Sequence, residues 1–349
     1  MSVSEKTMTP RVSYTNLDIA KFICALLVIM IHTSPFVDIP VAHFYTVSVI
    51  ARTAVPLFFA FSGFLLFGQM SYENSKLTDS PRNRSRLRRY LKKTINLYLF
   101  WSVVYLLVLL PEWYLIGWWG WTAVKDAVYA FLMKGMFAHL WYLLALIWAV
   151  AILYMLLRVI PLDKLRGIAL VLWFAECLDT SYGWLWNNRI EFFTFVSEKL
   201  PVVFSSTRCA LPLMVFGASV AVDRRSRKTS ARLRKFLIVA AAWVLEASAI
   251  YFSVPGHDHF SSMFVAPFFV YVTLDLLVSE KQIGIPVRIQ SLMRETIMVI
   301  YCLHPLLIHL FKKLGMVPGI VLWLLSTVAS VGLAYIWALQ KNRRTTNGS

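Results

Sequence analysis

Charged side chains are scarce in this sequence. Asp, Glu, Lys and Arg make up 15% of the 349 residues, whereas soluble domains contain about 25%. Hydrophobic residues account for 58% and aromatic residues for 15%, which is more apolar surface than one soluble core can hide. The many aromatic residues also exclude a disordered chain. The composition therefore predicts a membrane protein with several spans.

Cysteines and acidic residues are also few. The four cysteines lie in apolar runs without metal-ligand spacing, so we predict neither a disulfide framework nor a metal site. Asp and Glu number 18 against 35 Lys and Arg, a net charge of +17. In a soluble protein this charge would suggest nucleic-acid binding. Here the basic residues lie in a few loops between apolar runs, so we expect no nucleic-acid partner and interpret these loops as cytoplasmic.

The apolar runs predict an all-α fold, a polytopic membrane bundle of about ten transmembrane helices, because lipid offers no partners for open backbone groups. The predicted spans are 17–36, 47–68, 94–114, 139–160, 167–186, 201–222, 236–254, 261–279, 295–314 and 319–339. Lys and Arg concentrate in loops 69–93 and 223–235 and in the tail, which places both termini in the cytoplasm. We expect one membrane domain over 1–349, with a cytoplasmic segment 1–16 and a cytoplasmic tail 340–349.

Segment 115–138 is the longest piece on the opposite side. It contains Trp118, Trp119 and Trp121, followed by an amphipathic stretch from Asp126 to Phe137. This pattern predicts a helix at the membrane interface with an aromatic anchor.

Ionisable residues inside spans need a reason, because each costs about 2.5–3.5 kcal/mol to insert. Lys21 and His32 share one face of the first helix, roughly 16 Å apart along its axis. One interpretation is a Lys that reaches toward the headgroups and a His that is hydrogen-bonded in the bundle. The other is a face that turns inward, with His32 as general base, since the unperturbed pKa of His is near 6.5.

Arg52 and Arg208 fall in the outer parts of their spans, at a depth similar to that of His32. Either arginine could extend to the membrane surface. Together with His32 they instead predict one polar cavity in which a guanidinium holds a carboxylate, a phosphate or a developing oxyanion. Glu176, Asp179 and Glu246 are the expected counter-ions.

Two further sets of residues are candidates. His139 begins the fourth span and His304 precedes a proline in the ninth, and either histidine alone fits a structural role. Arg86, Arg88 and Arg89 lead into the third span and could bind the phosphates of a cytosolic donor. Contact with anionic lipid explains the basic cluster equally well.

Five strings together resemble the acyltransferase-3 superfamily of integral membrane acyltransferases. They are the Lys21/His32 spacing, the Arg-x-x-Val-Pro-Leu-Phe-Phe-x-x-Ser-Gly-Phe string from Arg52, the basic run before the third helix, His-Leu-Trp-Tyr-Leu from His139, and Ile-Tyr-x-x-His-Pro from Ile300. They extend over most of the chain and follow the family's order. Within the superfamily the chain looks most similar to enterobacterial-type O-acetyltransferases and to the membrane domain of vancomycin-resistance serine racemases.

The resemblance implies a multi-pass protein of the bacterial cell (inner) membrane that takes an acyl group, usually acetyl, from cytoplasmic acyl-CoA. The acceptor would be a hydroxyl of a carbohydrate, a cell-wall component or an amino acid. His32, Arg52 and Arg208 are the expected catalytic residues, and Lys21, Arg86, Arg88 and Arg89 the donor-binding residues. His139, Trp141, Tyr142 and His304 are the expected supporting residues.

We therefore predict a membrane O-acyltransferase, with acetyl-CoA as the donor substrate and membrane lipid around it. The alternative is a transport protein for a small amino acid such as L-serine, with a separate racemase as its partner. In that alternative the intramembrane arginines and acidic residues bind carboxylate and ammonium groups and no chemistry follows.

Overall fold

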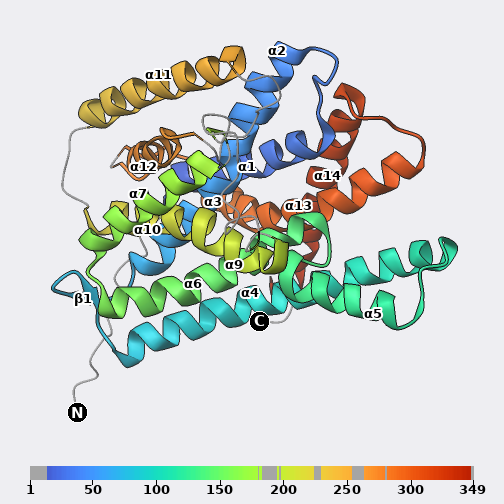
Figure 1. Cartoon of the computed structure of the whole chain (residues 1–349), viewed down its shortest axis with the longest axis horizontal. Helices are drawn as coiled ribbons and strands as arrows, with labels where there is room; N and C mark the ends of the chain where they lie inside the picture. Colours follow the sequence, from blue (N-terminus) through green and yellow to red (C-terminus); the bar gives the residue numbers. More distant parts are fainter. Residues whose placement is uncertain are drawn as a thin grey trace.

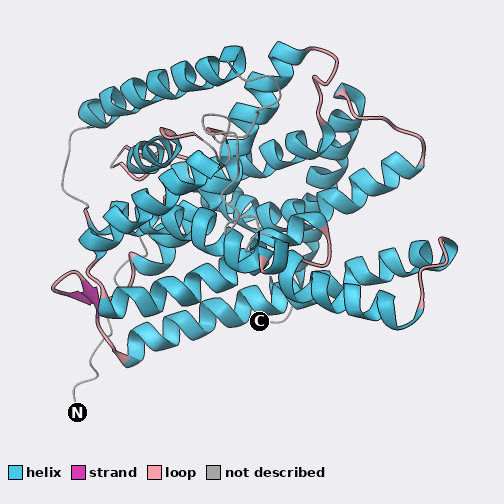
Figure 2. Cartoon of the chain, viewed as in Figure 1, coloured by secondary structure: helices cyan, strands magenta, loops and turns pink. Residues whose placement is uncertain are grey.

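The protein is a bundle of helices in which the described strands form a single short hairpin (Figures 1 and 2). The computed structural model describes residues 14–179, 181–182, 195, 198–223, 229–253, 263–279 and 281–346. Of the predicted segments, residues 1–13, the basic positions 224–228, the outer end of span 167–186 and residues 347–349 lie outside the described residues.

The first half of the chain contains the helices that carry most predicted site residues. They are α1 (Thr15–Thr33), α2 (Pro40–His43), the π-helix η1 (Phe44–Ile50), the 3-10 turn η2 (Ala51–Thr53), α3 (Ala54–Phe67), α4 (Pro81–Leu115), α5 (Gly120–Tyr129), the π-helix η3 (Ala130–Lys134), the 3-10 turn η4 (Ala138–Leu140) and α6 (Trp141–Val159). Strands β1 (Tyr72–Glu73) and β2 (Lys76–Leu77) pair antiparallel between α3 and α4.

The second half is also helical. They are α7 (Leu162–Asp179), α9 (Pro201–Ser205), the π-helix η6 (Ser206–Ala210), α10 (Leu211–Val222), α11 (Thr229–Ser253), α12 (Ala266–Leu277), α13 (Val287–Lys313) and α14 (Ile320–Thr346).

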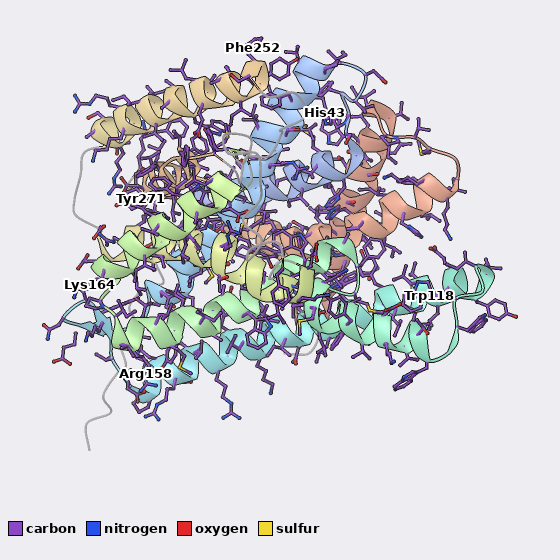
Figure 3. All side chains as sticks on the ribbon, viewed as in Figure 1. His43, Trp118, Arg158, Lys164, Phe252 and Tyr271 are labelled. Carbon is purple, nitrogen blue, oxygen red and sulfur yellow. The ribbon has the colours of Figure 1, made fainter. Side chains whose placement is uncertain are left out.

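Each of the ten predicted spans overlaps a described helix, which confirms the all-helical fold class. Among the described residues, seven helical stretches are long and apolar enough to cross a membrane, and two shorter apolar helices accompany them. The protein is therefore a multi-pass membrane protein. Figure 3 places Arg158 and Lys164 at one end of the bundle and Trp118 at the other. The charge pattern predicts this separation, while the compartment that each end faces stays a prediction.

Helix α4 begins well before the predicted span, so the basic cluster is helical rather than part of a loop. The side chain of Ser80 accepts a hydrogen bond from the backbone N–H of Asn83 at 3.2 Å, and Pro81 follows as the first helical residue. A serine cap followed by proline is a strong helix start. The basic residues therefore lie on a helix that continues without a break into the membrane span.

The predicted interfacial helix is present but begins earlier than expected. Helix α5 starts at Gly120 and, with the end of α4, projects from the bundle (Figure 1). Trp121 is 71% exposed, and the Lys125 ammonium lies 5.7 Å from the centroid of its ring. Trp121 therefore belongs to the helix, whereas the sequence predicted that it precedes the helix.

Helices α3 and α10 cross at two glycines in the centre of the bundle. A Cβ added to Gly63 would lie 2.2 Å from the carbonyl oxygen of Met214, and one added to Gly217 would lie 2.0 Å from that of Ala60. Small residues allow membrane helices to approach backbone to backbone. This crossing fixes α3, and with it the position of the η2 turn at its start.

Candidate functional site

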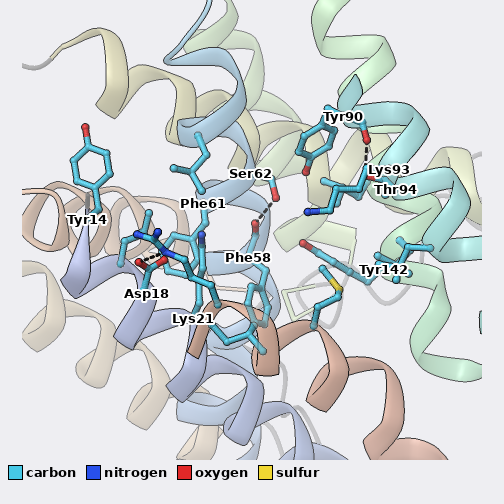
Figure 4. Close-up of a pocket in the computed structure, with 18 residues that line it drawn as sticks. Tyr14, Asp18, Lys21, Phe58, Phe61, Ser62, Tyr90, Lys93, Thr94 and Tyr142 are labelled. Atoms are coloured by element: carbon cyan, nitrogen blue, oxygen red, sulfur yellow. Dashed lines mark hydrogen bonds and ion pairs between the residues drawn. The ribbon is translucent and has the colours of Figure 1, made fainter. Parts of the chain in front are cut away.

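A cavity of about 430 Å³ lies between α1, α3, α4, α6 and α13 (Figure 4). Two basic side chains, Lys21 and Arg294, line it on the α1 and α13 side, and Lys93 lines it from α4. Most of the remaining wall is apolar or aromatic. The cavity thus combines cations with an apolar lining, as a site for an anionic molecule with an apolar arm would.

An acidic residue organises the basic wall on α1 and α13. The Oδ2 atom of Asp18 accepts hydrogen bonds from Nε2 of Gln290 at 2.8 Å and from Nε of Arg294 at 2.7 Å. Asp18 is buried, and a buried carboxylate is stable only with such partners. Lys21 lies one turn further along α1 and also lines the cavity.

The basic cluster of α4 divides over two faces of the helix. Lys93 faces the cavity, and Figure 4 shows its amine directed toward Ser62 and Tyr142. Arg88 instead lines a separate shallow groove together with Lys92. Arg88 and Arg89 are exposed and Arg86 is partly buried.

Lys93 is not among the residues predicted to bind the donor, although it belongs to the basic run before the third span. Tyr90, Lys93, Thr94 and Leu97 all line the cavity, and their spacing of i, i+3, i+4 and i+7 marks one face of a helix. This spacing could have identified Lys93 once the helix was known to start at Pro81.

Three aromatic rings connect the cavity to the interior of the bundle. Phe58 and Tyr142 line the cavity, and their ring centroids are 6.2 Å apart. The Tyr301 ring lies 5.5 Å from Tyr142 and 6.4 Å from Phe58. The Tyr301 hydroxyl donates to the backbone carbonyl of His139 at 2.6 Å. We call Phe58, Tyr142 and Tyr301 the aromatic layer.

Beyond this layer three histidines come together from α1, η4 and α13. The ring centroid of His304 lies 5.4 Å from that of His32 and 5.9 Å from that of His139. His139 is 3% exposed and His304 is fully buried. From the sequence, each of the three histidines is a separate candidate, and no pattern predicts that they lie close together. Within the described residues, no group of His, Cys, Asp or Glu has the arrangement of a metal site.

A tight turn brings His139 to this position. Gly135 has φ +89°, and a Cβ there would lie 2.5 Å from the backbone nitrogen of Trp141. Only glycine combines this conformation with such a close approach. The Trp141 ring itself packs against Phe59 at 6.2 Å, on the α3 side.

The η2 turn that carries Arg52 packs against α1, the helix that carries His32. That the two side chains share one polar cavity stays a prediction. The π-helix η1 and the 3-10 turn η2 precede α3. Such departures from α-helical geometry often occur at functional sites.

Arg208 is held by α7. Its Nε atom lies 2.9 Å from Oε2 of Glu176, and its Nη2 donates to the carbonyl of Ala175 at 2.9 Å. Glu176 is thus the counter-ion that the sequence predicted. The role of Arg208 in holding an oxyanion stays a prediction.

The other two expected counter-ions differ from Glu176. Glu246 accepts hydrogen bonds from the backbone N–H groups of Phe264 at 2.6 Å and Val265 at 2.8 Å, just before α12 begins. The expectation of Glu246 as an arginine partner is therefore wrong, because orphan amides at a helix start attract a carboxylate as strongly. The Asp179 side chain lies outside the described residues.

The family model described as an acyltransferase domain, acyltransferase-3, matches residues 14–339. The chain belongs to the acyltransferase-3 family. The match includes the cavity, the aromatic layer and the three histidines.

Relatives with this sequence pattern include two enterococcal proteins. The chain is 25% identical to a serine/alanine racemase of Enterococcus gallinarum over 335 residues, which is 93% of this chain and 46% of the relative. It is 31% identical to an amino-acid racemase of Enterococcus faecalis over 187 residues, which is 50% of this chain and 23% of the relative. The chain therefore spans less than half the length of either relative. No solved structure matches this acyltransferase-3 chain.

Proposed function

We propose that the chain is an acyl-CoA-dependent O-acyltransferase of the bacterial cell membrane, with acetyl-CoA as its donor. The observation that carries the proposal is the cavity with three basic residues, whose aromatic layer packs against the group of histidines that includes His32. A CoA thioester has the matching chemistry, since it joins phosphates to a long, weakly polar arm that ends in a reactive carbonyl.

Donor binding follows from the charges around the cavity. Lys21, Lys93 and Arg294 supply positive charge at its walls, and Arg86 on α4 extends that charge away from the bundle. Guanidinium and ammonium groups bind phosphate oxygens through charge-assisted hydrogen bonds. The pantetheine arm then lies along the apolar wall, with its thioester directed toward the aromatic layer.

The transfer step uses His32 and Arg52. Neutral His32 accepts the proton of the acceptor hydroxyl, and the oxygen attacks the thioester carbonyl. The Arg52 guanidinium stabilises the negative charge that develops on the carbonyl oxygen. The thioester and His32 meet at the aromatic layer, so Tyr142 and Tyr301 must move or admit the thioester between them. The acceptor is a hydroxyl of a carbohydrate, a cell-wall component or an amino acid.

Transport of a small amino acid is the second candidate. It is favoured by the racemase names of the relatives, which concern serine and alanine, and by a buried Arg208–Glu176 pair with the charges that an amino acid carries. A separate racemase partner belongs to this candidate.

One experiment separates the two candidates. The purified chain is reconstituted in vesicles with acetyl-CoA labelled in its acetyl group and with L-serine, glucose or N-acetylmuramic acid. We expect label in a product that hydroxylamine cleaves, as it cleaves esters and not amides, with one CoA thiol released per label. His32→Ala is the matched control. Serine exchange without acetyl-CoA, and no labelled ester, would favour transport.

A further inference from the structure

The tautomer of His304 is set by its own helix. Its Nδ1 atom lies 3.0 Å from the backbone carbonyl oxygen of Ile300. A carbonyl can only accept, so Nδ1 carries the proton and Nε2 keeps its lone pair. Within the described residues Nε2 of His304 has no hydrogen-bond partner, and the residue is fully buried. A buried acceptor without a donor is costly, so a donor is to be sought among the groups that face Nε2.

The neighbour best placed to supply that proton is His32. The 5.4 Å between the two ring centroids is close to the separation of about 5 Å at which one N–H···N hydrogen bond joins two imidazoles. The rings are inclined by 36°, so a modest rotation of His32 about its side-chain bonds aligns them. Helices α1 and α13 pack directly against each other, so their backbones can stay in place.

We propose that His304 is the positioning partner and proton acceptor of His32, so that acyl transfer uses a relay of two histidines. This inference rests on the proposed acyltransferase function and goes beyond it by assigning the second base. His304 accepts the N–H of His32, which leaves the other nitrogen of His32 as the base that faces the acceptor hydroxyl.

The relay balances for the whole reaction. The acceptor oxygen forms a C–O bond to the acyl carbon, the C–S bond breaks, and sulfur leaves with the electron pair. The hydroxyl proton moves to His32 as the proton on the opposite nitrogen of His32 moves to Nε2 of His304. The positive charge then rests on His304, deep in the bundle. Return of that proton ends on the leaving thiolate, which becomes the CoA thiol.

His139 is less suited to the same role. Its ring centroid lies 5.9 Å from that of His304, and neither of its ring nitrogens has a hydrogen-bond partner among the described residues. Its tautomer is therefore not set by a backbone carbonyl as that of His304 is. The hydrogen bond from Tyr301 reaches the backbone of His139 and not its ring.

His304→Asn is the decisive variant. An Asn amide N–H stands close to where Nδ1–H of His stands, so it can still donate to Ile300, whereas the acceptor at Nε2 is lost. His304→Ala with added imidazole is the second variant, because the small molecule can restore the missing base. His43→Asn, a histidine from the end of α2 outside this group, is the matched control.

The measurements use the full chain in lipid nanodiscs, acetyl-CoA and whichever of the three hydroxyl compounds above the wild type acetylates. We expect His304→Asn to lower kcat by about 10- to 100-fold, the range found when a metal-bound histidine loses its outer hydrogen-bond partner, with KM for acetyl-CoA unchanged. In mixtures of H₂O and D₂O the wild-type rate should curve with deuterium fraction, as two moving protons require, and the His304→Asn rate should fall on a straight line. Imidazole should restore His304→Ala.

Each contrary result has a separate meaning. A wild type that acetylates none of the compounds contradicts the proposed function itself. An active wild type with a straight deuterium plot, or His304→Asn with wild-type kcat, overturns the relay alone. A loss in His304→Asn that keeps the curved plot, with no rescue of His304→Ala by imidazole, assigns His304 a purely structural role and also overturns the relay.

Discussion

The Tyr301 hydroxyl donates a hydrogen bond to the backbone carbonyl of His139 at 2.6 Å, which links the middle of α13 to the η4 turn just before α6. The same tyrosine ring belongs to the aromatic layer, and His304 follows it by three residues on α13. One hydrogen bond therefore joins the aromatic layer to the backbone of the histidine group.

Removal of that bond should disturb the site more than the fold. We expect Tyr301→Phe to cost about 0.5–1.5 kcal/mol of stability and to reduce acyl transfer, because His139 and His304 lose a fixed spacing. Tyr129→Phe is the matched control, since it removes a 2.8 Å hydrogen bond to the carbonyl of Glu198, away from the site. Thermal unfolding and turnover are measured on both variants. Equal turnover in Tyr301→Phe and Tyr129→Phe would show that the hydrogen bond from Tyr301 to His139 does not position the site.

His32→Ala should leave the protein inserted and monodisperse but lower the acyl-transfer rate by about 10²–10⁴, the usual contribution of a general base. The check is turnover of labelled acetyl-CoA by purified protein, with acetyl-CoA binding measured in parallel. Binding should be unchanged, because His32 lies beyond the aromatic layer from the cavity. Near wild-type turnover would remove His32 from the mechanism.

Adjacent lysines on α4 give a sharp test of the donor site. Lys93 lines the cavity, whereas Lys92 lines the separate groove. We expect Lys93→Glu to weaken acetyl-CoA binding and Lys92→Glu, with the same change of charge, to weaken it much less. Arg86 lies seven residues before Lys93 and so on the same face of α4, whereas Arg88 lines the groove; Arg86→Glu should therefore weaken binding more than Arg88→Glu. Calorimetric titration with acetyl-CoA measures all four, and equal effects would indicate a general surface potential instead of a site.

Arg52→Lys should lose most of the activity while it keeps the positive charge. A lysine cannot offer two parallel donors to an oxyanion. The effect should appear in kcat rather than in KM for acetyl-CoA, because developing charge is held only in the transition state. Wild-type kcat in Arg52→Lys would show that charge alone is sufficient.

The glycine crossing makes a prediction about stability. Gly63→Ala and Gly217→Ala each place a methyl group against a backbone carbonyl of the facing helix, so each should lower stability by about 1–3 kcal/mol. Gly167→Ala is the control, because nothing lies within 4 Å of its added Cβ. Detergent-solubilised protein is heated and the midpoints compared. A control that falls as far as the other two would contradict the crossing as the cause.

The helices were predictable and the histidine group was not. A run of apolar residues specifies a membrane helix locally, and so each predicted span meets a described helix. The approach of His304 to His32 and His139 depends on which helices pack together, and residues of α1, η4 and α13 are far apart in the chain. Nothing in the local pattern of the sequence encodes that packing.

Some features of the site were predictable only in part. The start of α4 at Pro81 was readable from the Ser80 cap, and with it the position of Lys93 on the cavity face. The pairing of Arg208 with Glu176 followed from the cost of an isolated charge in a span. The same argument gave a wrong prediction for Glu246, because backbone amides satisfy a carboxylate as well as a guanidinium does.

The aromatic layer has a consequence for the membrane itself. A cavity with cations on its walls invites water and ions part of the way across the bilayer. Phe58, Tyr142 and Tyr301 stand in mutual ring contact at its inner limit, and a hydrated ion cannot pass between such rings without losing its water. Under the proposed function, this layer would let the protein admit a highly charged donor from one face without opening a path for ions to the other.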